Sequence, residues 1–233
     1  LIIDCQSKLR NSLILKQIPT KTFYSSTFNN IFCSGFDKNA KEEKHNNHGV
    51  YRTISSLKSL LSSDFKIIDY DIKKIPKEYI DESKRLLPDK NYIGFSLTQG
   101  NVYRKKSWPL ENFIVLAKQL IGRGKKIVFF VEKSEDKVIK DIKAILPEAL
   151  FPEHNSNIAC PALVTALASR LERVVTIDNG VMHMIALAKV PMVILFGPTN
   201  SEKFSPNQKN IKILDSKKIY GVKDVAKIKV NDV

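Results

Sequence analysis

The stretch LERVVTIDNGVMHMIALAKVPMVILFGPT, residues 171–199, decides the fold class. It holds two short apolar runs, 173–177 and 192–196, and an apolar segment at 181–188 that is suited to a helix. Strands that are buried on both faces lack polar alternation, as these runs do, and they are typical of a parallel sheet covered by helices. The stretch therefore predicts a strand–helix–strand unit of an α/β protein.

The same rhythm extends back toward residue 88. Two more strands are expected, at 92–97 and 126–131. Three more helices are expected, at 110–121, 134–145 and 161–169. Ser134 is the expected cap of the second of these helices. Residues 88–200 together predict a doubly wound α/β domain.

The chain divides into three parts by its pattern. Before residue 76 the pattern is irregular, with short strands at 1–3, 21–24 and 65–68, helices at 7–16 and 53–61, and a polar loop at 29–48. We interpret residues 1–75 as part of an N-terminal domain, 76–200 as the second α/β domain, and 201–233 as a segment that returns toward the first. Both ends look cut, since the opening Leu-Ile-Ile-Asp predicts the middle of a buried strand, so we expect a portion of a longer protein.

Composition narrows the class of protein. The net charge of +14 favours polyanionic partners, namely nucleic acid, anionic membrane surfaces or phosphorylated substrates. The lysines are spread along the chain rather than clustered among aromatics, so a nucleic-acid module is not expected, and a merely solvated basic surface stays open. Three widely spaced cysteines predict neither a disulfide framework nor a zinc site, which favours reduced thiols in a cytoplasmic protein.

Polar or glycine-bearing loops follow the four clearest strands. These loops lie at 98–100, 132–135, 178–180 and 197–199. Because open parallel sheets bind ligands at the carboxyl ends of their strands, the four loops are expected to converge on one edge of the sheet. The sequence therefore predicts a single ligand site at that edge.

The segment Asp-Asn-Gly-Val-Met-His at 178–183 is the sharpest part of this site. Gly180 permits a tight turn into a helix whose free amides and positive dipole end suit a diphosphate. Asp178 can accept hydrogen bonds from sugar hydroxyls, and His183 falls in the first helical turn. The structural alternative makes Asp178 a helix cap and His183 an interior histidine; the spacing to Phe-Gly-Pro-Thr at 196–199 favours the functional interpretation.

Two charged residues at the same edge are further candidates. Lys106 precedes a helix start and could stabilise the phosphate that leaves when a bond to a diphosphate breaks, although solvent-facing lysines are commoner. Glu135 could hold a ribose diol or simply favour a helix N-terminus, with Glu132 as a competing candidate. Trp108 is expected to be packed rather than stacked on a ligand.

No metal-ligand cluster, phosphate-binding glycine loop or nucleophile elbow is present, so no metal and no cofactor are expected.

These motifs resemble glycosyltransferase family 9, the lipopolysaccharide heptosyltransferases. The resemblance rests on Lys-Ser-Trp-Pro at 106–109, Asp-Asn-Gly-Val-Met-His at 178–183, Pro191 and Phe-Gly-Pro-Thr at 196–199, in that order and spacing. It implies an α/β fold of two Rossmann-like domains of the GT-B type. The N-terminal one, at 1–75, would be on the acceptor side and is incomplete in this chain; the C-terminal one, at 76–200, would bind the nucleotide sugar. The resemblance also implies an inverting, metal-independent transfer of heptose from ADP-heptose to a lipid A–core acceptor.

The resemblance assigns nucleotide-sugar-binding roles to eight residues: Thr98, Lys106, Glu135, Ala159, Asp178, Asn179, Gly180 and His183. Thr98 and Lys106 would face the diphosphate and sugar. Glu135 would face the ribose, and Ala159 the adenine. Lys106 and Asp178 would also be catalytic. The general base of the family would lie upstream of Leu1, and Asp4 does not match it. The family has Thr or Ser where Asn179 stands, and residues 99–105 are longer here than in the family.

Three alternatives stay open beside this interpretation. The same fold could use another nucleotide sugar, or the chain could be a non-catalytic nucleotide- or polyanion-binding protein, or a family member that only scaffolds an assembly. The expected partners are a nucleotide-sugar donor and a lipid A–core acceptor. The expected location is the cytoplasm, with peripheral contact at the inner face of the inner membrane as an option.

Overall fold

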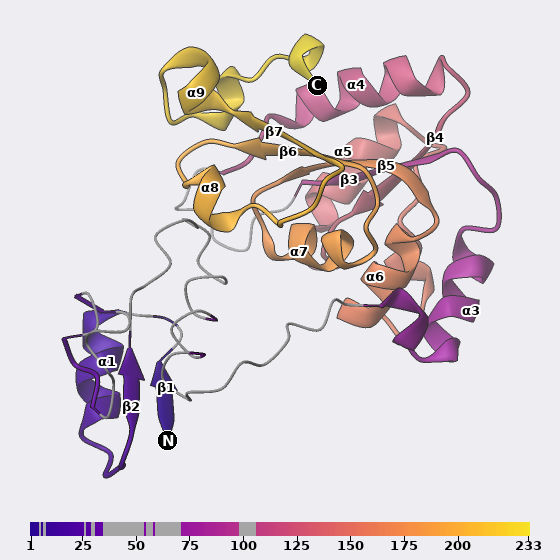
Figure 1. Ribbon diagram of the computed structural model, residues 1–233. Coiled ribbons are helices and arrows are strands. Elements are labelled where there is room, and N and C mark those ends of the chain that lie inside the picture. The colour runs from indigo at the N-terminus through magenta and orange to yellow at the C-terminus, as the bar shows by residue number, and fades with distance from the viewer. Residues whose placement is uncertain are drawn as a thin grey trace. The chain divides into compact units, whose positions relative to one another are not determined.

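Figure 1 shows the computed structural model. It describes residues 1–4, 6, 8–25, 27–28, 31–34, 54, 58, 71–97 and 106–233. The chain separates into two compact units, Leu1–Ile68 and Asp69–Val233. Each unit is described by itself.

The first unit holds two parallel strands and one helix. They are β1 (Ile2–Asp4), β2 (Phe23–Ser25) and α1 (Leu9–Lys16), which confirms the first two expected strands and the first expected helix to within two residues. The buried residue of α1 is Ser12, whose hydroxyl donates to the carboxylate of Asp4 at 2.6 Å. Apart from residues 54 and 58, the helix and strand expected at 53–61 and 65–68 lie outside the described residues, as does most of the loop at 29–48.

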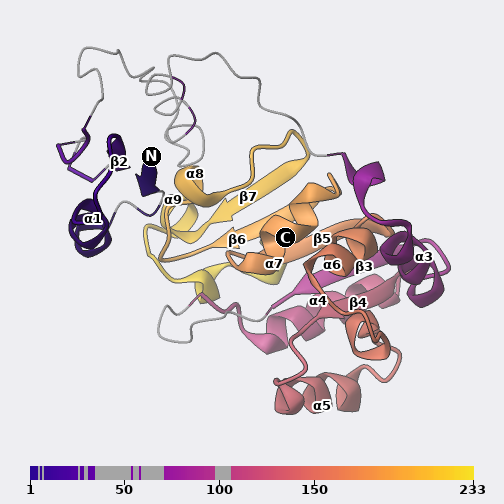
Figure 2. The same cartoon turned by 90° about the horizontal axis from the view of Figure 1, so that it is seen from below.

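The second unit is built on a five-stranded parallel sheet. The strand order is β4-β3-β5-β6-β7, and Figure 2 shows the strands side by side in this order. Their bounds are β3 Tyr92–Ser96, β4 Lys126–Phe130, β5 Leu171–Ile177, β6 Met192–Phe196 and β7 Ile211–Asp215. The four strands expected from apolar runs are confirmed. The fifth, β7, was not expected, because an edge strand keeps one side exposed and its Ile-Lys-Ile-Leu-Asp segment is not a continuous apolar run.

Helices cover both faces of this sheet (Figures 1 and 2). The longer ones are α3 (Lys77–Leu86), α4 (Leu110–Ile121), α5 (Asp136–Ile145), α6 (Pro161–Ala168) and α7 (Gly180–Leu187). Short helical turns make up much of the remainder: η1 (Ile72–Lys74), η3 (Pro152–Asn155), α8 (Ser201–Phe204), α9 (Ser216–Tyr220), η4 (Val225–Lys227) and η5 (Val230–Asp232). The doubly wound α/β architecture is therefore confirmed for the second unit.

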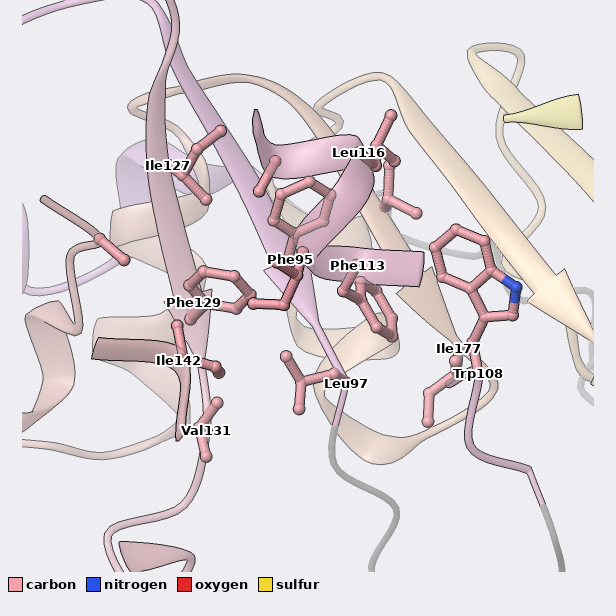
Figure 3. Packing of buried hydrophobic residues seen from close by; sticks show 14 of the residues in the cluster. Phe95, Leu97, Trp108, Phe113, Leu116, Ile127, Phe129, Val131, Ile142 and Ile177 are labelled. Atoms are coloured by element: carbon pink, nitrogen blue, oxygen red, sulfur yellow. The ribbon is translucent and has the colours of Figure 1, made fainter. Parts of the chain in front are cut away.

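The two faces of the sheet carry separate hydrophobic clusters. Phe95 and Phe129 point to the face of α4 and α5, where they pack with Phe113 and Trp108 (Figure 3). Residues that alternate with them, such as Phe130, point to the face of α6 and α7. Burial on both faces explains why these strands carry apolar runs without alternation.

Trp108 ties the end of the chain to this core. It is 2% exposed, and its indole Nε1 donates to the carbonyl of Ile228 at 2.7 Å. The expectation that Trp108 is packed is thereby confirmed. Val225 and Ile228 complete the same cluster, so the C-terminal segment is part of the folded unit.

One helix start differs from expectation. Helix α5 begins at Asp136, and Glu135 rather than Ser134 stands at its N-cap position, without a side-chain cap. The amide of Glu135 donates to the carbonyl of Glu132 at 3.0 Å. This turn over 132–135 uses the residues that would have formed the first helical turn. In the described part of the chain, no helix has the length and apolar character needed to cross a membrane.

Candidate functional site

The strand order creates a crevice between β3 and β5. The chain passes from β3 to β4 on one side, then crosses to β5 on the other side of β3. Loops that leave two neighbouring strands in opposite directions open a crevice at the carboxyl edge, where open α/β sheets bind ligands. Asp178 follows β5 directly, and Lys106 lies on the connection from β3 to α4. The two best sequence candidates therefore meet at this switch point.

Lys106 and Asp178 form a largely buried ion pair. The Lys106 Nζ lies 2.5 Å from Asp178 Oδ2 and also donates to the Asp178 carbonyl at 3.3 Å. Their side chains are 12% and 8% exposed. Thr199 Oγ1, from the loop after β6, donates to the same Oδ2 at 2.6 Å. The carboxylate is thus fixed from both sides, by a cation and by a hydroxyl.

The start of α7 presents backbone amides beside this pair. Asn179 is the N-cap: its Oδ1 accepts from the Met182 amide at 2.8 Å, and its Nδ2 donates to Ser96 Oγ at 2.9 Å. Asp178 is therefore not the helix cap. Thr, Ser and Asn all serve well at N-caps, so Asn179 is compatible with the Thr or Ser that the resemblance leads us to expect at this position.

Gly180 and His183 lie on an open side of α7. A Cβ placed on Gly180 would meet no atom within 4 Å, so packing does not require the glycine, and a ligand can approach the backbone there. His183 is exposed, which excludes the interior histidine of the structural alternative. Both residues line a groove of about 550 Å³ that runs along the helix.

The carboxyl end of β4 carries an acidic group. Glu132 and Glu135 are exposed there, and neighbouring η3 contributes Glu153 and His154. The His154 Nε2 lies 2.8 Å from the Val131 carbonyl, which fixes η3 against the strand end. Burial raises the pKa of Glu153 to about 7; the Glu132 carboxylate adds to the rise and Lys133 opposes it.

The structure brings most of the eight sequence candidates to one edge. Lys106, Asp178, Asn179 and Gly180 lie together at the switch point, with His183 one turn further along α7. Glu135 lies at the end of β4, and exposed Ala159 just before α6. Thr98 lies outside the described residues. The binding roles given to these residues stay predictions.

Sequence reasoning missed three residues of this edge. Thr199 stood in a loop expected at the edge, but its partner Asp178 is 21 positions away and could not be identified from spacing. Ser96 is the last residue of a buried strand and gave no signal. Glu153 lies in a short turn after α5, where no strand marks an edge position; only its place in Phe-Pro-Glu-His, after an apolar run, hinted at burial.

Within the described ranges, no group of three or more His, Cys, Asp or Glu side chains is arranged to hold a metal ion. The positive charge at the crevice comes from Lys106 and from the amide end of α7. These two sources can meet an anionic ligand directly.

Comparison with known proteins places these features in a family. The sequence profile described as glycosyltransferase family 9 (heptosyltransferase) matches residues 1–232. Lipooligosaccharide heptosyltransferase 2 of Haemophilus influenzae is 30% identical over 129 residues, which cover 54% of this chain and 37% of that protein. Lipopolysaccharide heptosyltransferase 2 of Salmonella typhimurium is 32% identical over 107 residues, covering 43% and 29%. The matches thus span about a third of the length of these relatives.

Solved structures show the same fold. Escherichia coli heptosyltransferase WaaC with ADP superposes with a TM-score of 0.68 at 16% identity, over 99% of this chain and 69% of that one. Escherichia coli ADP-heptose lps heptosyltransferase II gives a TM-score of 0.65 at 16% identity, over 98% and 72%. The expected two-domain α/β fold is confirmed by this likeness. With the family profile matching nearly the whole sequence, the chain belongs to glycosyltransferase family 9, the heptosyltransferases.

Proposed function

We propose that this chain carries the donor-binding part of a glycosyltransferase that transfers heptose from ADP-heptose to a lipopolysaccharide core acceptor. The transfer would invert the anomeric centre and need no metal ion or cofactor. The observation that carries the proposal is the contact of Lys106, Asp178 and Thr199 at the switch point, beside the amide end of α7. This arrangement offers positive charge for a diphosphate and a fixed carboxylate for sugar hydroxyls.

The diphosphate would lie on the first amides of α7. The first N–H groups of a helix have no acceptor within the helix, and the helix dipole favours an anion there, so the amides of Asn179 and Gly180 would face the diphosphate. Lys106 is close enough to exchange its partner, from the Asp178 carboxylate to a phosphate oxygen. A cation in this position stabilises the leaving diphosphate as the glycosidic bond breaks, which is the work that a metal ion does in other enzymes.

The sugar would lie on the Asp178 side of the diphosphate. Asp178 is 7% exposed and keeps its orientation through Thr199, so it can accept hydrogen bonds from sugar hydroxyls without rearranging. His183, one turn along α7, is exposed and would support the same turn.

The nucleoside would extend in the opposite direction, toward β4. That strand lies on the far side of β3 from β5, and Glu135 and Glu132 stand at its end. A carboxylate there can accept hydrogen bonds from the ribose diol, and the exposed backbone at Ala159 can face adenine. Thr98 would approach the diphosphate from the β3 loop. We expect the general base from the N-terminal domain rather than from the residues named here.

The acceptor belongs to the proposal as well. The named relatives are lipopolysaccharide and lipooligosaccharide heptosyltransferases, and a lipid A–core acceptor is anionic and membrane-bound. A net charge of +14 favours approach to such a surface. We therefore propose peripheral contact with the inner face of the inner membrane during transfer.

Calorimetric titration with ADP and ADP-heptose, at two salt concentrations, tests the donor site. In Asp178→Ala we expect the affinity for ADP-heptose to fall about tenfold, since a hydrogen bond to a charged group is lost. The affinity for ADP should stay level or rise, because Lys106 is released to the phosphates. Asp141→Ala removes the same charge from an exposed position on α5 and is the control.

The outcomes separate the alternatives. Unchanged ADP-heptose affinity in Asp178→Ala contradicts the assignment of the sugar site. Tighter binding of a different nucleotide sugar would keep the fold and change the donor. Salt-sensitive binding of nucleic acid without nucleotide preference would favour the polyanion-binding alternative. Donor binding without transfer by the whole protein would favour a non-catalytic family member.

A further inference from the structure

Ser96 is a buried polar residue at the end of the central strand β3. It is 0% exposed, and it pairs in register with Phe130 of β4 on one side and with Thr176 of β5 on the other. Paired residues of neighbouring strands point to the same face of a sheet, so Ser96 shares with Phe130 the face that α6 and α7 cover. A hydroxyl that is buried in such a place needs a hydrogen-bond partner.

The partner is the side chain of Asn179, the N-cap of α7. Its Oδ1 accepts from the Met182 amide at 2.8 Å, and its Nδ2 donates to Ser96 Oγ at 2.9 Å. The orientation of this side-chain amide follows from its partners, because a backbone N–H can only donate and must therefore face the oxygen. The nitrogen then points to Ser96. One side chain thus connects the first turn of α7 to the end of β3.

This connection depends on asparagine at position 179. Ser or Thr, which the resemblance leads us to expect there, has a single side-chain oxygen, and the helix cap uses it. Asparagine carries an NH₂ group as well, so it can cap the helix and donate across to β3 at the same time. Ser96 and Asn179 therefore form a matched pair, and Ser96 should matter only while Asn179 is present.

The pair lies beside the position proposed for the diphosphate. The amides of Asn179 and Gly180 would face this group, at the start of α7. The preceding residue, Asp178, is bound by Lys106 from the connection between β3 and α4. Donor binding is proposed to draw Lys106 from Asp178 toward the phosphates. The bond between Ser96 and Asn179 involves neither charge, so it would persist and keep the start of α7 attached to β3.

We propose that Ser96 is a positioning residue for the diphosphate of the donor, because through Asn179 it fixes the first amides of α7 where the phosphates would bind. Amides that are ordered before binding hold an anion more tightly than amides that the ligand must first order. The choice of ligand rests on the proposed function, since the diphosphate is the group that α7 is proposed to hold.

The test compares ADP with adenosine as ligands of the whole chain. Calorimetry measures the affinity for ADP, and NMR titration measures the weaker affinity for adenosine. In Ser96→Ala we expect the affinity for ADP to fall about fivefold, since the start of α7 loses its hydrogen bond to β3. The affinity for adenosine should stay level, because the nucleoside would extend toward β4, away from α7.

A second background shows whether Ser96 acts through Asn179. Threonine caps α7 without Ser96, so adding Ser96→Ala to Asn179→Thr should change the affinity for ADP by less than about twofold. A serine that merely stabilises the strand would cost the same in both backgrounds. If Ser96→Ala does not fold, Ser96→Cys takes its place: the thiol has a similar shape and is a weaker acceptor, so a smaller loss of ADP affinity is expected.

The matched control removes a buried serine elsewhere. Ser216 on α9 is also 0% exposed, and its Oγ donates to the Val222 carbonyl at 2.8 Å. Ser216→Ala should lower the midpoint of urea unfolding and leave the affinity for ADP unchanged.

Three results would overturn the proposal. They are unchanged ADP affinity in Ser96→Ala (or in Ser96→Cys where it takes its place), an equal loss of adenosine and ADP affinity, and the same loss in the Asn179→Thr background as in the parent. Each of them defeats this inference alone, because the parent chain still binds ADP. A parent chain that does not bind ADP defeats the proposed function, and this inference with it.

Discussion

At the scale of single residues, Thr199 has the most consequential position. Its hydroxyl donates to Asp178 on one side, and on the other side the residue lines a cavity of about 390 Å³ between the loops that follow β6 and β7. Lys106 reaches the same carboxylate from the opposite direction. When a donor draws Lys106 toward its phosphates, the hydrogen bond from Thr199 remains to orient the carboxylate. Thr199 is therefore a positioning residue for the sugar site.

Thr199→Val keeps the shape of the side chain and removes the hydroxyl. We expect the affinity for ADP-heptose to fall roughly tenfold, since a hydrogen bond to a charged group contributes about 1.5–3 kcal/mol. Binding of ADP should change little, because ADP lacks the transferred sugar that Asp178 is proposed to hold. Calorimetry measures both, and Thr199→Ser should restore the loss. Equal weakening of ADP and ADP-heptose would contradict the positioning role.

Glu153 gives the protein a pH-dependent stability. Its pKa is raised from 4.5 to about 7, first by burial and then by Glu132. The folded state therefore binds this proton more tightly than the unfolded state. The resulting stabilisation is complete below pH 4.5 and is lost as the pH rises through about 7.

Glu153→Gln should remove this pH dependence. A neutral amide has no proton to lose, so at pH 8 we expect the variant to be more stable than the parent by about 2 kcal/mol. At pH 4.5 the two proteins should be nearly equal. Urea unfolding at both pH values measures the difference, with exposed Glu148→Gln as the control. A gap of the same size at both pH values would exclude titration of Glu153 as the cause.

At the scale of elements, the carboxyl end of β6 depends on contact with η4. A Cβ on Gly197 would lie 2.6 Å from the Val225 amide nitrogen and 3.0 Å from the Val225 Cβ. The same C-terminal segment continues to Ile228, whose carbonyl accepts from the indole of Trp108. The loop that carries Thr199 is thus supported by residues almost thirty positions later in the chain.

Gly197→Ala should loosen this support. Forcing an extra methyl group against a backbone nitrogen costs about 1–3 kcal/mol of folding free energy. Trp108 is the single tryptophan, so its fluorescence during urea unfolding reports on the affected region directly. Gly122→Ala is the control: its nearest neighbours would be 3.5 and 3.6 Å away and its φ is −60°, so it should be neutral or stabilising. Similar midpoints for both variants would contradict the close contact.

The elements also show which parts of the fold could be predicted from the sequence. Strands β3 to β6 are buried on both faces, and their apolar runs stood out. Strand β7 escaped because Lys212 and Asp215 interrupt its apolar residues, so that no continuous apolar run stood out. Helix α5 starts later than expected, since a turn over 132–135 competes with its first turn. Local pattern identifies an element when burial is complete, and it fails where an edge or a competing turn intervenes.

At the scale of the whole molecule, the strand order places the residues proposed to bind the donor in a row along one edge of the sheet. From β4 to β6, the carboxyl edge carries the ribose candidates, then Lys106, Asp178 and Thr199. The sequence could predict that these loops share one edge, because parallel strands end together. It could not give the order β4-β3-β5-β6-β7, which depends on crossovers between elements, nor the pairing of Lys106 with a residue 72 positions away.

This arrangement lies within one unit of the chain, which leads to a prediction at the largest scale. The donor-side residues all fall in Asp69–Val233, and both hydrophobic clusters of the sheet are built from the same unit. A chain of residues 69–233 should therefore unfold cooperatively and bind ADP within about threefold of the longer chain, a difference of less than 1 kcal/mol. Circular dichroism and calorimetry measure the two properties. A chain of residues 1–223 is the matched control, because it loses Val225 and Ile228 from the core and should lose both its cooperative unfolding and its ADP binding. If the 69–233 chain folds but does not bind ADP, residues 1–68 contribute to the donor site, and the assignment of donor binding to the second unit alone is wrong.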